Sequence, residues 1–308
     1  SVFSGFSDLL SRYWECSGRS PSKAIMQSKR FLSGVLGLII AFLTAGFIGN
    51  IIQKRQIVQQ IDRLHRTARI DRDGVFTTDD IASVPDPVQG YFTNVLQEGQ
   101  EYVSTVRLKQ EGKLRSGGAD SDWKPFTATQ HITVDPPGFL WNATVRLWPL
   151  IRLRITDLYR DGNGSAAISL FGVIPLGGDD QNPELNEGEL LRYLAEAVWY
   201  PTALLPSQGV HWTAIDDSTA MATIEYGGAT ATLTFHFTEN DEVAKVHAAE
   251  RPRRVDNGYE PTPWTGHWDD YQTVNGMRIP TTGEVVWHLP EEDMTAWQGQ
   301  LIDINYAD

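Results

Sequence analysis

The chain has 308 residues, of which 41% are hydrophobic, and it is long enough for one large folded domain or two modest ones. Its formal net charge of −13 is unevenly distributed, because residues 1–79 carry 11 Lys or Arg against 6 Asp or Glu, whereas residues 80–308 carry 15 against 33. So acidic a body repels phosphate backbones, which excludes nucleic acid as an expected partner.

An uncharged run extends from Phe31 to Ile52, with the sequence FLSGVLGLIIAFLTAGFIGNII. Roughly 20 apolar residues let a helix cross the hydrocarbon core of a bilayer. We therefore predict a tail over residues 1–30 and a transmembrane helix over residues 31–53 that contacts the lipid bilayer. The alternative is a cleaved signal peptide, but the run is longer than the roughly 7–15 residues of an ordinary h-region.

The body is expected on the outer side of the inner (cytoplasmic) membrane. Basic residues flank both ends of the apolar run, so the positive-inside rule barely discriminates between the two orientations. The single cysteine, Cys16, lies in the tail, and a cysteine-free body fits an extracytoplasmic location without requiring one. We predict a single-pass membrane protein with a periplasmic body.

Residues 54–79 are predicted to form a helical stalk and a turn. Ile57, Ile61 and Leu64 recur at helical spacing, so the membrane helix is expected to continue. The segment RIDRDGVFTTDD (69–80) resembles an EF-hand loop, but Arg69 stands where calcium needs its first carboxylate. A turn followed by a threonine helix cap explains the segment better, and we expect no metal site.

For residues 80–308 the pattern predicts a mainly β (α+β) domain: a large antiparallel, strongly curved sheet or half-barrel with covering helices. Residues 84–99 are typical of a proline-initiated helix with one apolar stripe. Apolar and polar residues then alternate, as in LIRLRIT (150–156), and turn segments such as RDGNGS (160–165) separate these runs. The pattern indicates about ten or eleven strands.

One helix, over residues 187–199, interrupts the strands. Its segment GELLRYLAEAVWYPTALLP (188–206) combines apolar, acidic, basic and aromatic residues and ends against proline. Leu190, Leu194, Ala197 and Val198 can face the sheet, which places the polar residues on the other side or at the rim. At spacings of three and four, the charged residues Glu189, Arg192 and Glu196 are explained by an ordinary helix-surface ion network.

No reaction centre is visible in the sequence. The seven histidines are scattered without a metal-binding spacing, and neither a GxSxG nor a Walker loop occurs. We therefore assign no catalytic residue, no metal ligand and no cofactor, and an enzymatic activity is uncertain and less favoured than none.

A second cluster, ERPRRVDNGYEPTPWTGHWDDY (250–271), combines arginines with aromatic residues. If its arginines meet the acids of the helix, the result is either a structural ion-pair and cation–π network or a site for an anionic headgroup or carboxylate. The candidate ligand-binding residues are Glu189, Arg192, Tyr193, Glu196, Arg251, Arg253, Trp264, Trp268 and Tyr271.

Four segments carry a family resemblance: VPDPVQGYF (84–92), the helix segment extended to Trp212, TPWTGHWDDY (262–271) and MRIPTTGEVVWHLP (277–290). They resemble the signatures of an uncharacterised bacterial family of membrane-anchored domains, with no assigned activity, over about residues 80–308. More distantly, the layout is similar to periplasmic lipoprotein carriers of the LolA/LolB type, which implies an open half-barrel with helices over a hydrophobic cavity. A fold does not fix a function.

The expected function is a membrane-anchored, non-enzymatic binding domain for an apolar ligand or lipidated partner. The alternative is an accessory or structural subunit docked on a larger membrane protein complex, so lipids and membrane-complex subunits are the expected partners. A continuous open cavity favours the first, and a filled core with exposed aromatic residues favours the second.

Overall fold

The computed structural model describes residues 34, 37, 44, 49–69, 74–115, 118–148 and 151–307. The chain divides into two units, Ser1–Ile52 and Gln53–Asp308. The predicted tail and most of the predicted transmembrane segment lie outside the described residues, and residues 34, 37, 44 and 49–52 of that segment are helical. Within the part of the chain that is described, no helix combines the length and the apolar character needed to span a bilayer.

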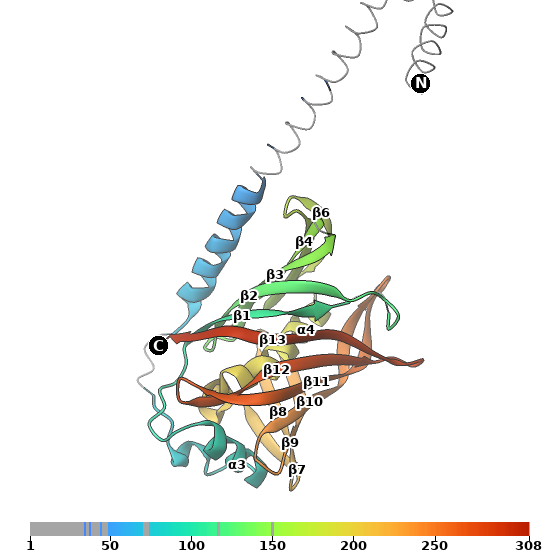
Figure 1. Cartoon of the computed structure of the whole chain (residues 1–308). Coiled ribbons are helices and arrows are strands. Elements are labelled where there is room, and N and C mark those ends of the chain that lie inside the picture. Colours follow the sequence, from blue (N-terminus) through green and yellow to red (C-terminus); the bar gives the residue numbers. More distant parts are fainter. Residues whose placement is uncertain are drawn as a thin grey trace, which may run out of the picture. The chain divides into compact units, whose positions relative to one another are not determined.

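The second unit is mainly β, as the alternating pattern predicts (Figure 1). Its described strands are β1 (Thr105–Leu114), β2 (Lys124–Thr133), β3 (Gly138–Trp148), β4 (Ile151–Arg160), β5 (Asn163–Leu170), β6 (Ile174–Asp180), β7 (His211–Asp216), β8 (Thr219–Tyr226), β9 (Ala229–Phe237), β10 (Val243–Val255), β11 (Gly258–Val274), β12 (Met277–His288) and β13 (Asp293–Ala307). Its helices are α3 (Asp86–Val95) and α4 (Pro183–Glu196), with 3-10 turns at Thr78–Ile81, Ala197–Trp199, Pro201–Leu204 and Pro206–Gln208.

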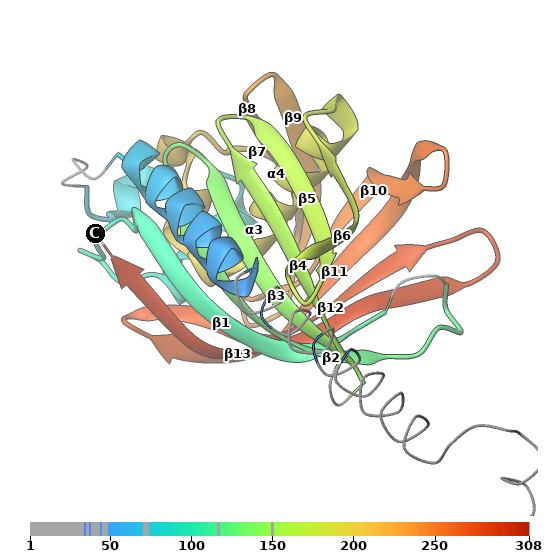
Figure 2. The same ribbon diagram turned by 90° about the horizontal axis from the view of Figure 1, so that it is seen from above.

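All of these strands belong to one antiparallel sheet in the order β6-β5-β4-β3-β2-β1-β13-β12-β11-β10-β9-β8-β7. The sheet is not closed, because β6 and β7 at its two edges do not pair with each other. It curves around α4, which contacts β4, β5, β9 and β10 (Figure 2). The predicted curved, open sheet is therefore confirmed. The predicted strand number, about ten or eleven, was too low.

Turns from distant parts of the chain narrow the open side of the sheet. Gly162 in the β4–β5 turn lies so close to Gly227 in the β8–β9 turn that a Cβ on Gly162 would come within 2.5 Å of the Gly227 Cα. Near the β6 edge, Asp179 forms an ion pair with Arg254 and accepts a hydrogen bond from the Tyr259 hydroxyl at 2.9 Å. These contacts join the β4–β6 side of the sheet to the β8–β11 side without strand pairing.

The helix α4 begins earlier than predicted. Asn182 caps it by accepting a hydrogen bond from the Leu185 N–H at 2.7 Å, and Pro183 occupies the first helical position. The last part of the predicted helix, Ala197–Trp199, is a 3-10 turn. Pro183 at the first helical position and Glu184 in the first turn are both favourable signals for this earlier start.

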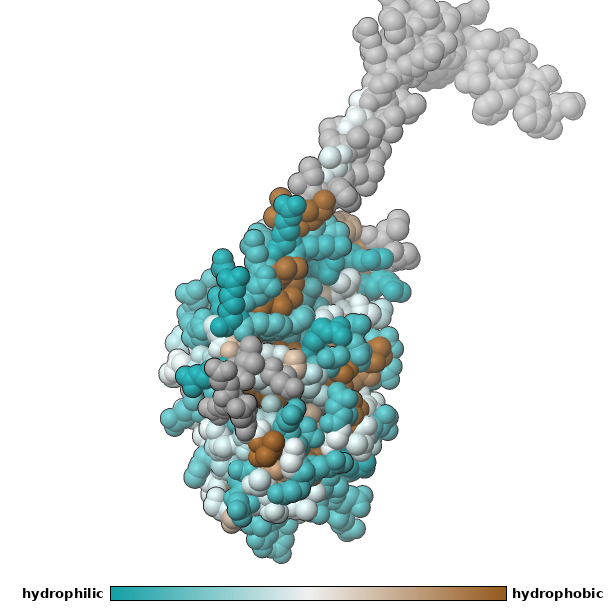
Figure 3. Space-filling model, turned by 90° about the vertical axis from the view of Figure 1, so that its left-hand side faces the viewer, coloured by the Kyte–Doolittle hydropathy of each residue, from teal (hydrophilic) through white to brown (hydrophobic). Residues whose placement is uncertain are grey.

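A helix that includes residues 53–67 lies against the outer face of the sheet (Figure 2). Leu64 is fully buried with Leu140 and Leu158, and Ile57 and Ile61 pack against the same cluster. The apolar stripe of the predicted stalk is therefore used for packing on β3 and β4. On the face shown in Figure 3, hydrophobic residues form small separate patches in a mainly hydrophilic surface.

Thr77 occupies the N-cap position of the 3-10 turn before α3, and its backbone N–H donates to the Asp80 carboxylate at 2.7 Å. Residues 70–73 of the segment that resembles an EF-hand loop lie outside the described residues.

Candidate functional site

The polar face of α4 lies inside the curved sheet. Glu189 has a relative exposure of 7%, and the side chains of Arg192 and Glu196 have exposures of 17% and 12%. The prediction that these residues lie on the solvent side or at the rim was wrong. The sheet curves far enough to surround α4, so both faces of the helix are covered.

Arg192 is the centre of a buried ion-pair cluster. Its Nη1 contacts Asp157 Oδ2 of β4 at 2.8 Å, and its Nε contacts Glu196 Oε1 at 2.8 Å. The second oxygen of Glu196 accepts a hydrogen bond from Gln130 Nε2 of β2 at 2.6 Å. The guanidinium also lies 4.9 Å from the centre of the Trp141 ring. Because Arg192 joins α4 to β4 and Glu196 joins it to β2, the cluster fixes the helix inside the sheet.

Arg251 of β10 forms the second arginine site against α4. Its Nη2 donates to the Gly188 carbonyl oxygen at 3.2 Å. Its guanidinium lies 4.6 Å from the centre of the Trp264 ring and 5.5 Å from that of Trp287, which are cation–π distances. No described residue accepts a hydrogen bond from its Nε.

Burial shifts the pKa values of the charged residues in this cluster. It raises the pKa of Glu189 to about 8, with a further contribution from Asp157, so Glu189 is protonated at neutral pH. Burial also raises the pKa of Asp157, against the opposing effect of Arg192, and lowers the pKa of Arg251 to about 10. Burial lowers the pKa of Arg192, but Glu196 and Asp157 outweigh it, and the net shift is upward. With Glu189 neutral, the cluster holds two arginines and two further acids, Asp157 and Glu196, both of which pair with Arg192.

A cavity of about 290 Å³ lies between this cluster and the hairpins at one end of the sheet. Its lining includes six of the ten tryptophans of the chain: Trp141, Trp199, Trp264, Trp268, Trp287 and Trp297. Arg115, Trp287 and Trp297 are half-buried, so the cavity reaches the surface at this end. We call it the tryptophan cavity. An apolar lining with few polar groups is typical of small-molecule sites.

Several buried donors around the tryptophan cavity have no partner among the described residues. They are the indole Nε1 atoms of Trp199, Trp264 and Trp268 and the Nε of Arg251. Buried indole N–H groups ordinarily find an acceptor, because leaving a polar group unpaired costs free energy. These donors therefore fit a ligand that brings oxygen acceptors, such as a carboxylate, an ester or a phosphate.

A second hollow of about 440 Å³ adjoins the other side of Arg251, between α4, β5 and the β10–β11 hairpin. Glu189 lines this hollow, and one oxygen of its carboxyl group has no hydrogen-bond partner among the described residues. A further hollow of about 620 Å³ is lined by strand residues such as Glu111, Lys113 and Arg152 and includes none of the buried cluster. Among the described residues, no group of three or more His, Cys, Asp or Glu side chains has a metal-site arrangement.

The structure brings six of the nine predicted site residues together, and these residues are Glu189, Arg192, Glu196, Arg251, Trp264 and Trp268. The other three lie elsewhere. Tyr193 points into the core and donates to the Val134 carbonyl at 3.2 Å, and Arg253 bonds Thr262 and the exposed Glu260.

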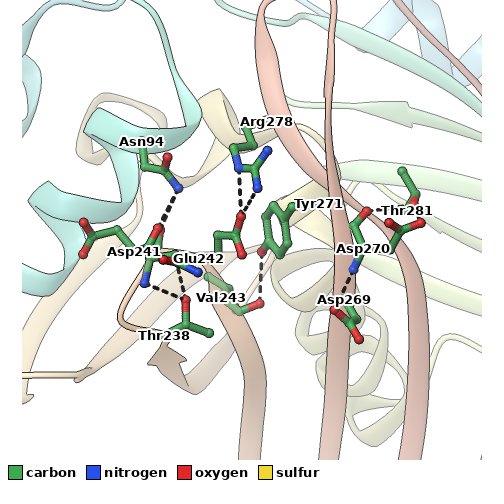
Figure 4. A network of polar contacts seen from close by, with 11 residues as sticks. Asn94, Thr238, Asp241, Glu242, Val243, Asp269, Asp270, Tyr271, Arg278 and Thr281 are labelled. Carbon is green, nitrogen blue, oxygen red and sulfur yellow. Dashed lines mark hydrogen bonds and ion pairs between the residues drawn. The ribbon is translucent and has the colours of Figure 1, made fainter.

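Tyr271 lies near the end of β11 and is not part of the lining of the tryptophan cavity. Figure 4 shows it beside Val243, Glu242 and Arg278. Its hydroxyl donates to the Val243 carbonyl at 3.0 Å, and its ring lies 5.9 Å from the Arg278 guanidinium. Arg278 in turn contacts the Glu242 carboxylate through its Nε at 2.8 Å. The short sequence distance from Trp268 to Tyr271 is misleading, because an extended strand moves successive residues rapidly apart.

Asp157 is the principal residue that sequence reasoning missed, and the alternation of β4 contains the signal for it. Ile151, Leu153, Ile155 and Tyr159 mark the inward face, so Asp157 at the intervening odd position must also point inward. A carboxylate at an inward position requires a buried cation, which is Arg192.

Solved structures with a similar arrangement cover most of the body. A putative outer membrane lipoprotein-sorting protein domain from Vibrio parahaemolyticus matches 72% of this chain and 91% of its own, with a TM-score of 0.41 and 10% identity. A LolA superfamily protein from Nitrosomonas europaea matches 67% and 87%, with a TM-score of 0.35 and 9% identity. Both TM-scores lie below 0.5, and neither a fold family nor a function is assigned from these similarities.

Among curated proteins, no significant match to the chain was found. The model of a family of unknown function (DUF6920) matches residues 82–306, which is most of the chain and nearly all of the body. The resemblance to an uncharacterised family is thereby confirmed, and the chain belongs to the family of unknown function DUF6920.

Proposed function

We propose that this protein is a membrane-anchored, non-enzymatic binding domain that takes an apolar ligand, or the acyl chain of a lipidated partner, into the tryptophan cavity. The observation that carries the proposal is the combination of an apolar lining with unpartnered indole and guanidinium N–H groups among the described residues. An acyl chain with an ester, carboxylate or phosphate group supplies both the apolar surface and the acceptors that such a lining needs.

The electrostatics of the cavity support a ligand with a small polar end. Asp157 and Glu196 offset Arg192 and Arg251, and Arg115 adds one positive charge to the cavity wall, which favours a ligand with a small anionic end. Arg251 retains one donor with no described partner and is held in place by two tryptophan rings. In this proposal Arg251 binds the oxygen atoms of the ligand, and Arg192 orients α4 without contacting the ligand.

The first experiment identifies what the cavity contains. The full chain is purified in mild detergent and its bound lipids are measured by mass spectrometry, together with any co-purifying subunits. We expect a stoichiometric acyl lipid. A lipid-free protein that purifies with other membrane subunits contradicts the proposal and supports the competing function, an accessory subunit of a larger complex.

A second experiment localises binding to the tryptophan cavity. Dibromostearic acid is titrated into the full chain, because bromine atoms quench tryptophan fluorescence on contact. Val285→Phe fills the cavity that Val285 lines, and we expect it to lower the affinity at least tenfold. Val274→Phe is the matched control, since Val274 is also a half-buried strand valine but lies outside the cavity lining. Equal quenching in both variants places the fatty acid elsewhere and refutes the proposal.

A further inference from the structure

A second surface with unusual properties lies at the tips of the β3–β4 and β5–β6 hairpins. Several large apolar side chains are exposed there: Trp148, Ile151, Phe171, Val173, Ile174 and Leu176. Trp148 is 69% exposed and Leu176 56%, which is unusual for such side chains. We call these six residues the apolar tips.

The two hairpins form one contiguous surface. The Phe171 N–H donates to the Arg152 carbonyl at 3.0 Å, so the β5–β6 turn lies beside the start of β4. Leu153 pairs with Leu170 in the same ladder. The exposed side chains of the two tips are therefore neighbours in space, although Trp148 and Phe171 are far apart in the chain.

Phe171 occupies its position at a conformational cost. Its φ is 54° and that of Gly172 is 77°, as in a type I′ turn, in which both central residues need a positive φ. Asn or Gly is the ordinary residue at the first of these positions, and a bulky aromatic residue is disfavoured in the left-handed region. An exposed phenylalanine placed there at a cost indicates that its ring is used outside the fold.

The charge around the apolar tips differs from that of the rest of the body. Residues 136–156 contain no Asp or Glu and three arginines, and residues 162–178 contain no charged residue, although residues 80–308 hold 33 acidic residues. Arg146 and Arg152 are exposed and paired across β3 and β4, next to Trp148 and Ile151. In the described part of the chain, no ion pair engages either arginine. Unpaired arginines beside exposed aromatic and aliphatic residues complement an anionic lipid surface.

The chain reaches this surface directly from the predicted transmembrane segment. Gln53 follows the uncharged run, and its Nε2 contacts Ser169 Oγ on the outer face of β5 at 3.5 Å. The exposed residues Lys54 and Arg55 come next. A segment that leaves the bilayer at this point holds the apolar tips within reach of the lipid headgroups.

We propose that the apolar tips insert into the interfacial layer of the membrane that carries the anchor. The occupant of this surface is lipid, not a second copy of the chain. Ile151 continues through Leu153 and Ile155 along one face of β4 to the tryptophan cavity, which Ile155 lines, so the inserted tips also offer a ligand an apolar route. The insertion rests on the predicted anchor and is independent of whether the cavity binds a ligand.

The test measures which solvent surrounds the tips. In a Cys16→Ser background, Val173→Cys at the tips or Ile215→Cys, an exposed apolar residue on β7, carries an environment-sensitive fluorophore. Each full-length chain is placed in nanodiscs of phosphatidylcholine and phosphatidylglycerol. We expect doxyl-labelled lipid to quench the label at position 173 several times more strongly than the label at 215, and aqueous iodide to show the reverse order.

A substitution separates insertion from folding. Phe171→Asn removes the strained aromatic residue, so it should raise the melting temperature while reducing lipid quenching of the label at position 173. Ile302→Asn, at an exposed isoleucine of β13, should leave the quenching unchanged. Strong iodide quenching at position 173 overturns the proposal. Shielding of position 173 from both quenchers, with disulfide crosslinking between unlabelled copies of the Val173→Cys variant, identifies a second chain as the occupant and also overturns it.

Discussion

The two ends of the domain interior are both built from aromatic side chains, but they differ in how tightly these pack and in whether their N–H groups are hydrogen-bonded. At the end covered by α3, the rings of Tyr91, Phe92, Trp212, Phe235 and Phe237 pack with centroid separations between 5.0 and 6.5 Å. The Trp212 indole donates to the Leu204 carbonyl at 2.9 Å. At the other end, six tryptophans surround a cavity of about 290 Å³, and three of their indole N–H groups have no partner in the described part of the chain.

This difference shows what distinguishes a candidate binding site from an aromatic core. Tryptophan content alone does not, because both ends contain tryptophan. The distinguishing features are unfilled volume and unpaired donors at the same place, which together lower stability unless something else supplies the contacts. We call the two regions the filled end and the cavity end.

The largest expected effect tests the buried ion-pair cluster through which α4 borders the cavity end. Arg192→Met leaves Asp157 and Glu196 inside the domain without their ion-pair partner. Removing one partner of a buried ion pair typically costs about 3–5 kcal/mol, and we expect a loss of that size in the free energy of unfolding. Chemical denaturation of the full chain in detergent measures it.

Arg253→Met is the control for this measurement. Arg253 also forms an ion pair, but its partner Glu260 is 62% exposed, and exposed pairs contribute about 0–1 kcal/mol. If both variants lose the same small amount, Arg192 does not hold the helix, and its place in the cluster must be explained by ligand contact.

The next largest effect is the loss of stability when a leucine is replaced by alanine, compared between the two ends. Leu233 of β9 is fully buried in the core at the filled end, and Leu233→Ala should cost about 2–5 kcal/mol through lost contacts and a new cavity. Leu114 is half-buried and lines a cavity that already exists, so Leu114→Ala should cost less than about half as much. Thermal melts of the two variants in parallel decide this, and equal losses would mean that the cavity end is packed as tightly as the filled end.

A smaller effect is expected from the titration of Glu189. Its folded pKa of about 8 lies above the ordinary value of 4.5, so the folded state holds a proton that the unfolded state has released between these two pH values. The contribution of the Glu189 proton to the free energy of unfolding is therefore fully present below pH 4.5 and decreases as the pH rises toward about 8. Because Asp157 shares this titration, we expect a decrease of about 1–3 kcal/mol.

Glu189→Gln should remove most of this slope, because glutamine has no proton to release. The variant should match the wild type near pH 4.5 and exceed its stability above pH 8. Melting temperatures measured across this range provide the check. A wild-type curve that stays flat would show that Glu189 is charged throughout and that the cluster carries a net negative charge.

Alternation and turn chemistry were sufficient to predict the sheet. The turn at residues 160–165 occurs where the sequence places it, because few residues other than Gly, Asn and Asp adopt the positive φ found at Asp161 and Gly162. The curvature was expected, but its extent was not. A period of 3.6 residues identifies the two faces of α4 without showing how far the sheet extends around the helix.

The site was predicted only in part for the same reason. Glu189, Arg192 and Glu196 are close in sequence, so their cluster is visible, and Arg251 with Trp264 follows from a local motif. The sequence does not show which strand residues reach this cluster, because the distance of each strand from α4 depends on how far the sheet curves. The residues missed for this reason are Gln130, Trp141 and Asp157. The volume of the tryptophan cavity likewise depends on how elements from distant parts of the chain pack together, which no local sequence pattern specifies.

The smallest expected effect is a change in indole signals with no change in fold. In a spectrum of the full chain labelled with ¹⁵N-tryptophan, titration with dodecanoic acid should shift the Nε1–H signals of Trp199, Trp264 and Trp268. These groups have no partner in the described part of the chain, so an incoming carboxylate gives them new hydrogen bonds. The Trp212 signal should stay in place, because its N–H already donates to the Leu204 carbonyl at the filled end. Assignment by single Trp→Phe substitutions identifies each signal.

A shift confined to Trp148, the 69% exposed indole at the apolar tips, would show that the fatty acid adsorbs on the surface and leaves the cavity unoccupied. Shifts of all signals together would report a change in the whole sheet and contradict the assignment of the cavity end as a preformed site.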